Sequence, residues 1–144
     1  MSVPIADSAE NPTPAIKVLL VDDQRMIVEV VRRLLADEPD IAFYFCTDPN
    51  EAVARANEVG PTIILQDMVM PALDGIELVR RFRANPQTAR TPIIVLSGMD
   101  DAESKSCAIA AGANDYLMKL PSQDMLVKHI RSKCSDDAAR REQA

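Results

Sequence analysis

The chain has 144 residues, of which 47% are hydrophobic and 26% charged, a composition typical of one globular domain with a full core. Its net charge of −6 disfavours broad electrostatic binding to nucleic acid or to an anionic membrane surface. The three cysteines lie far apart and form no metal-binding spacing, so we expect reduced thiols in a cytoplasmic protein. No apolar run approaches the roughly 20 residues that cross a bilayer, and residues 1–15 have the composition of a flexible tail rather than a signal peptide.

Short apolar runs alternate with helical patterns along the chain. The pattern predicts strands at residues 17–21, 41–46, 62–67, 92–97 and 114–118. It predicts helices at residues 26–35, 49–59, 75–83 and 101–111, and a fifth from Ser122 onward. Strict alternation with short loops indicates an α/β fold with a parallel sheet and helices on both faces. Five strands suit the flavodoxin-like, doubly wound order 2-1-3-4-5.

Several polar residues are expected to have structural roles. Asp48, Asp74 and Ser122 precede predicted helices and suit N-caps. We expect His129 to be a structural or surface residue, because no acid or cysteine lies at ligand spacing from it. The basic residues of the last helix are expected to form a solvated face, comprising Lys128, Arg131 and Lys133.

Acidic residues follow two predicted strands that the strand order makes neighbours. Asp22 and Asp23 end the first strand and Asp67 ends the third, so we expect all three in one crevice at the carboxyl edge of the sheet. Ser97 and Lys119 end the fourth and fifth strands at the same edge. Three close carboxylates would raise one another's pKa unless a cation neutralised them, and Mg²⁺ suits such oxygen ligands.

These groups suit phosphoryl chemistry. A cation, a lysine and a hydroxyl donor together can hold a tetrahedral, doubly charged group against Asp67. An aspartate can itself act as the nucleophile and form an aspartyl phosphate. Taken singly, each acid could instead be a cap or a strand terminator, but capping does not explain why they converge.

The chain resembles the receiver domain of two-component response regulators. The resemblance covers residues 16–133 and depends on motifs at the strand ends: Asp22-Asp23, Asp67-Met68-Val69-Met70-Pro71 with Asp74-Gly75, Leu96-Ser97-Gly98, and Gly112 to Lys119. We therefore expect a receiver domain over residues 16–134. Residues 135–144 are expected to be a C-terminal tail or the start of a linker to an output domain.

The resemblance implies a role for each matching residue. Asp67 would be the phosphoacceptor, Asp23 and Asp67 would ligate Mg²⁺ directly, and Asp22 would act largely through water. The remaining roles would be a metal ligand from the Val69 backbone carbonyl, phosphoryl contacts from Ser97 and Lys119, a rotamer switch at Tyr116, and space for phosphoryl donors at Gly98.

The resemblance also implies partners. These are a sensor histidine kinase or phosphotransfer protein and a downstream partner or output domain reached through the surface of helix four, strand five and helix five. The resemblance allows a homodimer and implies no direct contact with nucleic acid or membrane. The chain would be a signalling phosphoacceptor that catalyses only its own phosphotransfer and dephosphorylation.

Two short motifs refine the comparison. Leu65-Gln66-Asp67 and Lys119-Leu120-Pro121 are most similar to receivers of Wsp-type regulators, so the chain could be an excised receiver that controls a C-terminal diguanylate cyclase. Most receivers place proline directly after the lysine. Here Leu120 intervenes, so a cis peptide at that junction cannot be assumed.

Two other classes share parts of the pattern. An aspartate-nucleophile phosphatase of the haloacid dehalogenase type would carry Asp-x-Asp after the first strand, where this chain has adjacent aspartates. A flavodoxin-like FMN binder would share the fold, but the acidic crevice would repel the FMN phosphate.

Overall fold

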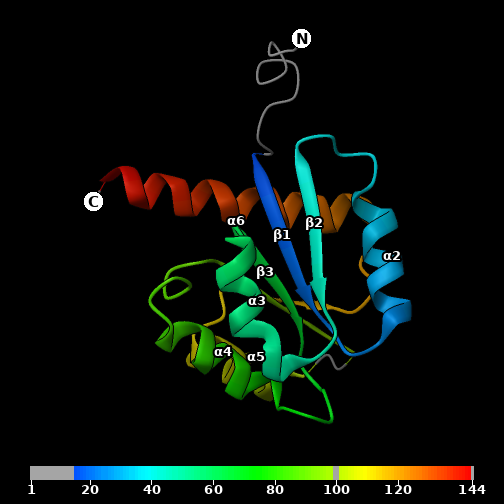
Figure 1. Cartoon of the computed structure of the whole chain (residues 1–144), viewed down its shortest axis with the longest axis vertical. Helices are drawn as coiled ribbons and strands as arrows, with labels where there is room; N and C mark the ends of the chain where they lie inside the picture. The colour runs from blue at the N-terminus through cyan, green and yellow to red at the C-terminus, as the bar shows by residue number, and fades with distance from the viewer. Residues whose placement is uncertain (1–14, 99–100, 144) are drawn as a thin grey trace.

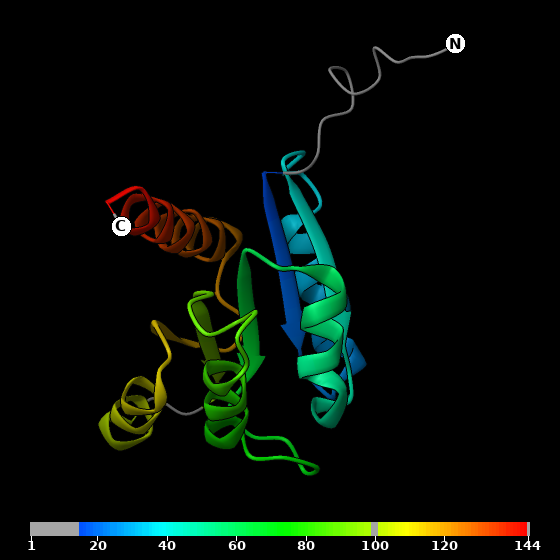
Figure 2. The same cartoon turned by 60° about the vertical axis from the view of Figure 1, so that its left-hand side comes forward.

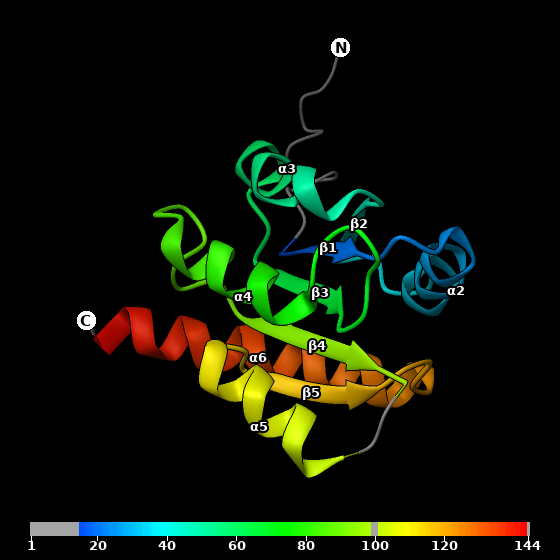
Figure 3. The same cartoon turned by 90° about the horizontal axis from the view of Figure 1, so that it is seen from below.

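The computed structural model describes residues 15–98 and 101–143. All of the tail expected at residues 1–15 except Ala15 lies outside the described residues. The described chain forms one sheet of five parallel strands in the order β2-β1-β3-β4-β5, which confirms the predicted order. The strands are β1 (Ile16–Val21), β2 (Ile41–Cys46), β3 (Ile63–Asp67), β4 (Ile93–Ser97) and β5 (Asp115–Met118). Their arrowheads point to one end of the sheet, where the loop after β3 projects (Figures 2 and 3).

Helices cover both faces of the sheet. They are α2 (Arg25–Leu35), α3 (Ala52–Val59, preceded by a 3-10 turn at Pro49–Glu51), α4 (Gly75–Ala84), α5 (Ala102–Ala111) and α6 (Gln123–Gln143). In Figure 1, α6 passes behind the strands, whereas α3 lies in front of them. The last helix includes residues 135–143, the stretch expected to be a tail or linker.

Two hydrophobic layers flank the sheet because successive strand side chains point to opposite faces. Val18 and Leu20 of β1 pack in the layer beneath α2 and α6. Leu19 and Val21 pack in the layer beneath α3, α4 and α5. Strands buried on both faces explain why the sequence shows continuous apolar runs rather than alternation.

Helix ends follow the expected residues in most places. Asp48 accepts a hydrogen bond from the Asn50 backbone N–H at 3.0 Å, and Ser122 Oγ accepts one from Met125 N at 3.2 Å. Gly60 ends α3 in the left-handed conformation, with φ of 67°. The prediction for Asp74 is wrong in one respect. Within the described chain its side chain accepts no capping bond, and only its carbonyl receives the Leu78 N–H, at 3.0 Å.

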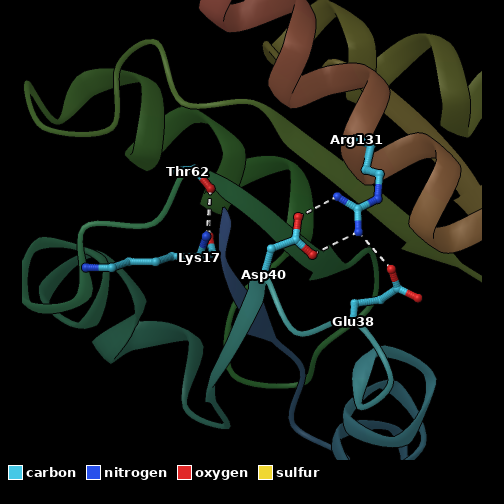
Figure 4. A network of polar contacts seen from close by, with 5 residues as sticks. All are labelled: Lys17, Glu38, Asp40, Thr62 and Arg131. Atoms are coloured by element: carbon cyan, nitrogen blue, oxygen red, sulfur yellow. Dashed lines mark hydrogen bonds and ion pairs between the residues drawn. The ribbon is translucent and has the colours of Figure 1, made fainter. Parts of the chain in front are cut away.

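Arg131 joins α6 to the connection between α2 and β2. Its guanidinium lies 2.8 Å and 3.0 Å from the two carboxylate oxygens of Asp40 and 2.7 Å from Glu38 Oε1 (Figure 4). Arg131 is still 40% exposed, but it also binds two acids that the expectation of a solvated face did not include. A helix pattern reports the period of apolar residues and cannot show that a charged residue meets acids about ninety positions away.

His129 has a partner that the sequence did not indicate. Its Nδ1 lies 2.6 Å from Asp115 Oδ2, a contact that joins α6 to the start of β5. The pair is partly buried, so His129 belongs to the packing between these two elements. Among the residues that the structure describes, no helix combines the length and apolarity required to span a membrane.

Candidate functional site

Three aspartates meet where β1 and β3 end. These strands are paired in parallel, so the acids that follow Val21 and Gln66 are delivered to the same edge. Asp22, Asp23 and Asp67 each offer a carboxylate oxygen within 4.8 Å of the others. Asp22 and Asp67 are buried, whereas Asp23 is partly exposed. The arrangement concentrates negative charge at the floor of the site.

Lys119 brings the compensating charge from the end of β5. Its Nζ lies 3.1 Å from Asp67 Oδ2 and 3.3 Å from Asp22 Oδ2. Burial lowers the pKa of Lys119, but the hydrogen bond to Asp67 and the charges of both carboxylates outweigh burial, so the pKa lies above its usual value. The lysine is therefore held in its charged form beside the acids.

Burial at this site changes the pKa of Asp22. Removal from water raises the pKa of its carboxyl group, the Gln24 N–H opposes that rise by donating to Oδ1 at 2.9 Å, and the charge of Asp67 adds to it. Oδ2 has no hydrogen bond of good geometry within the described chain, although Lys119 lies nearby. Lys119 offsets part of the charge on this oxygen, and a hard divalent cation would supply the closer partner that a buried carboxylate oxygen requires. The donor set therefore fits Mg²⁺.

The loop after β3 packs tightly against the start of α4. Gly75 N donates to Met68 O at 3.1 Å, and a Cβ at Gly75 would lie 2.5 Å from that same oxygen. Only glycine permits this approach. Val69 N donates to Asp67 Oδ1 at 3.3 Å, so the loop backbone contacts one carboxylate oxygen and Lys119 contacts the other. The Val69 side chain is exposed.

Ser97 and Tyr116 lie on neighbouring strands. Ser97 is buried at the end of β4, and its carbonyl receives the Lys119 N–H at 2.6 Å, which fixes the lysine backbone beside it. Tyr116 is 8% exposed and packs in the layer beneath α4 and α5. A Cβ on Gly98 would meet no atom within 4 Å, so the space beside the site is open at that residue.

Sequence reasoning missed two features beside these residues. Gln66 is completely buried and donates from Nε2 to Gly75 O at 2.8 Å. Leu120 has φ of 57°, and no other non-glycine residue of the described chain has positive φ. The polar Gln66 within an apolar run was a visible signal for the first. The insertion before Pro121 was a signal for the second. The described residues contain no cis peptide bond.

Known proteins are similar to this chain in sequence. The family model for the response regulator receiver domain matches residues 18–131. The transcriptional regulatory protein TrcR of Mycobacterium tuberculosis is 33% identical over 117 residues, covering 81% of this chain and 44% of TrcR. The regulatory protein VanRB of Enterococcus faecalis is 34% identical over 118 residues, covering 82% and 52%. The chain thus spans about half the length of these curated relatives.

Solved receiver structures match nearly end to end. The receiver domain of the Francisella response regulator 1452 superposes with a TM-score of 0.75 at 31% identity, covering 84% of this chain and 98% of that one. The chemotaxis protein CheY4 of Vibrio cholerae gives 0.76 at 31% identity, covering 82% and 98%. With the fold, the acidic cluster and the family match in agreement, this chain belongs to the response regulator receiver domain family.

Proposed function

We propose that this receiver accepts a phosphoryl group on Asp67 from a histidine kinase or phosphotransfer protein, with Mg²⁺ bound by Asp22, Asp23, Asp67 and the Val69 carbonyl. The observation that carries the proposal is the contact between Asp67 Oδ2 and Lys119 Nζ at 3.1 Å, beside two further carboxylates. A carboxylate that faces a fixed ammonium group is oriented for attack on an anionic phosphorus centre.

The transfer follows from these positions. An Asp67 carboxylate oxygen attacks phosphorus, the P–N bond of a donor phosphohistidine breaks, and the electron pair leaves with the imidazole nitrogen. Lys119 stabilises the charge on the phosphoryl oxygens, and the Ser97 hydroxyl donates a hydrogen bond to one of them. Bound Mg²⁺ would neutralise further charge as the group passes between the two partners.

The phosphoryl group would then alter the surface of the domain. Its added charge would draw in Ser97 and change the packing of Tyr116, so the surface of α5, β5 and α6 would shift between two states. The limited burial of α5 supports this role. Of its ten residues only Ala108 is buried, so little apolar contact is lost when the helix moves.

Substitution of Asp67 tests the assignment. The wild-type chain should be labelled by acetyl phosphate in a Mg²⁺-dependent reaction, and Asp67→Asn should show no label. Asp37→Asn removes an exposed acid from the loop after α2 and should be labelled as the wild type is. Equal labelling of Asp67→Asn would remove Asp67 as the acceptor.

The output of the signal is a finer proposal. The motifs at Leu65 to Asp67 and Lys119 to Pro121 favour a Wsp-type receiver that controls a diguanylate cyclase. Among the relatives described above, TrcR is a transcriptional regulatory protein. Another relative, the cyclic di-GMP phosphodiesterase response regulator RpfG of Xanthomonas campestris, is 28% identical over 137 residues, covering 94% of this chain and 35% of RpfG. Reading the parent gene past Ala144 distinguishes a cyclase output from a stop codon or another domain.

A further inference from the structure

Gln66 is a completely buried amide that directly precedes the proposed phosphoacceptor. It follows Leu65 on β3, and strand alternation places its side chain on the face covered by α3, α4 and α5. From there Nε2 donates to the carbonyl of Gly75, the first residue of α4, at 2.8 Å. The orientation of the amide is determined chemically, because a flipped amide would place two acceptors against each other.

This hydrogen bond closes the base of the loop formed by residues 68–74. The chain leaves the sheet after Asp67 and returns at Gly75, whose N–H donates to Met68 O at 3.1 Å. Gln66 therefore binds the carbonyl of Gly75, while Met68 binds its N–H group. The loop is tied to β3 at its beginning and at its end.

The closed loop contacts the proposed nucleophile. Met68 is hydrogen-bonded to Gly75, and the next residue, Val69, donates its N–H to Asp67 Oδ1 at 3.3 Å. The other oxygen, Oδ2, faces Lys119 Nζ. The orientation of the Asp67 carboxylate thus depends on the loop from one side and on the lysine from the other.

Stability alone does not explain a glutamine at this position. Its Oε1 is buried and has no hydrogen-bond partner among the described residues. An apolar residue of the same length would remove this unsatisfied atom and would match the hydrophobic layer around it, at the loss of the one hydrogen bond to Gly75 O. Groups kept at a cost to stability are concentrated at functional sites.

We propose that Gln66 is a positioning residue, whose bond to Gly75 holds the loop so that the Asp67 carboxylate and the Val69 backbone keep the arrangement that binds Mg²⁺ and accepts a phosphoryl group. The inference rests on the proposed function of Asp67. It assigns to Gln66 no contact with the phosphoryl group.

Gln66→Met tests the role because methionine has the same chain length and no polar hydrogen-bonding head. The midpoint of urea unfolding should stay equal or rise, since the unsatisfied oxygen is removed together with the hydrogen bond. The dissociation constant for Mg²⁺ alone should rise about tenfold, and labelling by acetyl phosphate should slow about tenfold. This is the effect typical of residues that orient the metal ligands without binding the metal. Amide exchange at Val69 should become faster.

Thr88→Val is the matched control. Thr88 is another buried polar side chain beside α4, and its Oγ1 donates to Phe82 O at 2.6 Å, at the end of the helix away from Gly75. Its replacement should lower the urea midpoint while Mg²⁺ affinity and labelling rate stay at wild-type values. A purely structural role for Gln66 would give the same result as this control.

The outcomes separate the inference from the proposed function. Wild-type Mg²⁺ affinity and labelling rate in Gln66→Met, or in Gln66→Leu if the first variant does not fold, would overturn the role of Gln66 and leave Asp67 as the acceptor. Fast solvent exchange of the Gln66 side-chain amide protons in the unaltered protein would also overturn it. Absence of label on the wild-type chain would instead remove the proposed function, whatever the loop does.

Discussion

Lys119 Nζ lies 3.1 Å from Asp67 Oδ2, so the end of β5 reaches past β4 to the acid at the end of β3. The same ammonium group lies 3.3 Å from Asp22 Oδ2. A single cation therefore offsets part of the charge of two buried carboxylates. A divalent cation at this site would be attracted by the negative charge of the two carboxylates and repelled by the positive charge of Lys119.

Removal of this lysine should have opposite effects on folding and on metal affinity. Lys119→Met leaves the carboxylates uncompensated, so without Mg²⁺ we expect the free energy of unfolding to fall by about 2 kcal/mol. We also expect a lower dissociation constant for Mg²⁺, because the competing charge is gone. At about 100 times that constant, Mg²⁺ should add about 2.7 kcal/mol to the free energy of unfolding. Urea unfolding with and without MgCl₂ measures both effects.

Lys128→Met provides the control, since it removes an exposed lysine from α6 without a change at the site. It should leave the Mg²⁺ response unchanged. Weaker Mg²⁺ binding in Lys119→Met than in the wild type would contradict the competition between lysine and metal.

Gly75 and Gly98 should respond differently to the same added methyl group. A Cβ at Gly75 would lie 2.5 Å from Met68 O, so Gly75→Ala should push α4 away from the loop and lower the free energy of unfolding by about 1–3 kcal/mol. A Cβ at Gly98 would meet no atom within 4 Å, so Gly98→Ala should change it by less than about 0.5 kcal/mol. Thermal unfolding of both variants gives the comparison, and similar losses would count against the close approach.

The sequence was sufficient for the fold and for the acidic cluster. Buried strands produce continuous apolar runs, and short alternating connections leave few topologies, so the strand order could be predicted. Once β1 and β3 are neighbours, residues at their ends must meet. This is why Asp22 and Asp67, 45 positions apart, could be placed together from the pattern alone.

Contacts made by single side chains could not be predicted in this way. The pairing of Arg131 with Asp40 depends on the angle at which α6 crosses the sheet, which apolar spacing does not specify. The bond from Gln66 to Gly75 depends on the path of the loop between them. The conformation of Leu120 depends on how the chain turns from β5 into α6, a choice that local propensity would not have favoured.

The contact between Arg131 and Asp40 should make folding sensitive to acid. The hydrogen bond from Arg131 holds the pKa of Asp40 below its ordinary value of 3.8. A carboxyl group with a depressed pKa in the folded state adds stability above its unfolded pKa and loses it as the pH falls through the folded value. The coupling between Arg131→Met and Asp40→Asn should therefore be favourable at neutral pH and should vanish below the folded pKa.

A double-mutant cycle in urea at several pH values measures this coupling. Because the pair is at the surface, added salt should weaken it at neutral pH. The charged atoms of Arg80, which is exposed, and Glu77, which is partly exposed, lie 4.0 Å apart, and this pair should show a smaller coupling. A coupling between Arg131 and Asp40 that stays constant down to low pH would contradict the electrostatic account.

Leu120 should be improved by residues that tolerate its backbone conformation. Its φ of 57° lies in the left-handed region, which costs a bulky residue about 1–2 kcal/mol, while its side chain is 54% exposed and contributes little burial. Leu120→Asn should raise the free energy of unfolding by about 0.5–1 kcal/mol, because asparagine adopts this region more readily. Leu120→Val should lower the free energy of unfolding by about 1 kcal/mol, because the β-branched valine side chain is more restricted. The turn directly follows Lys119, so the valine variant should also be labelled more slowly by acetyl phosphate. Equal stability of the asparagine and valine variants in urea would show that the left-handed turn imposes no strain on this chain.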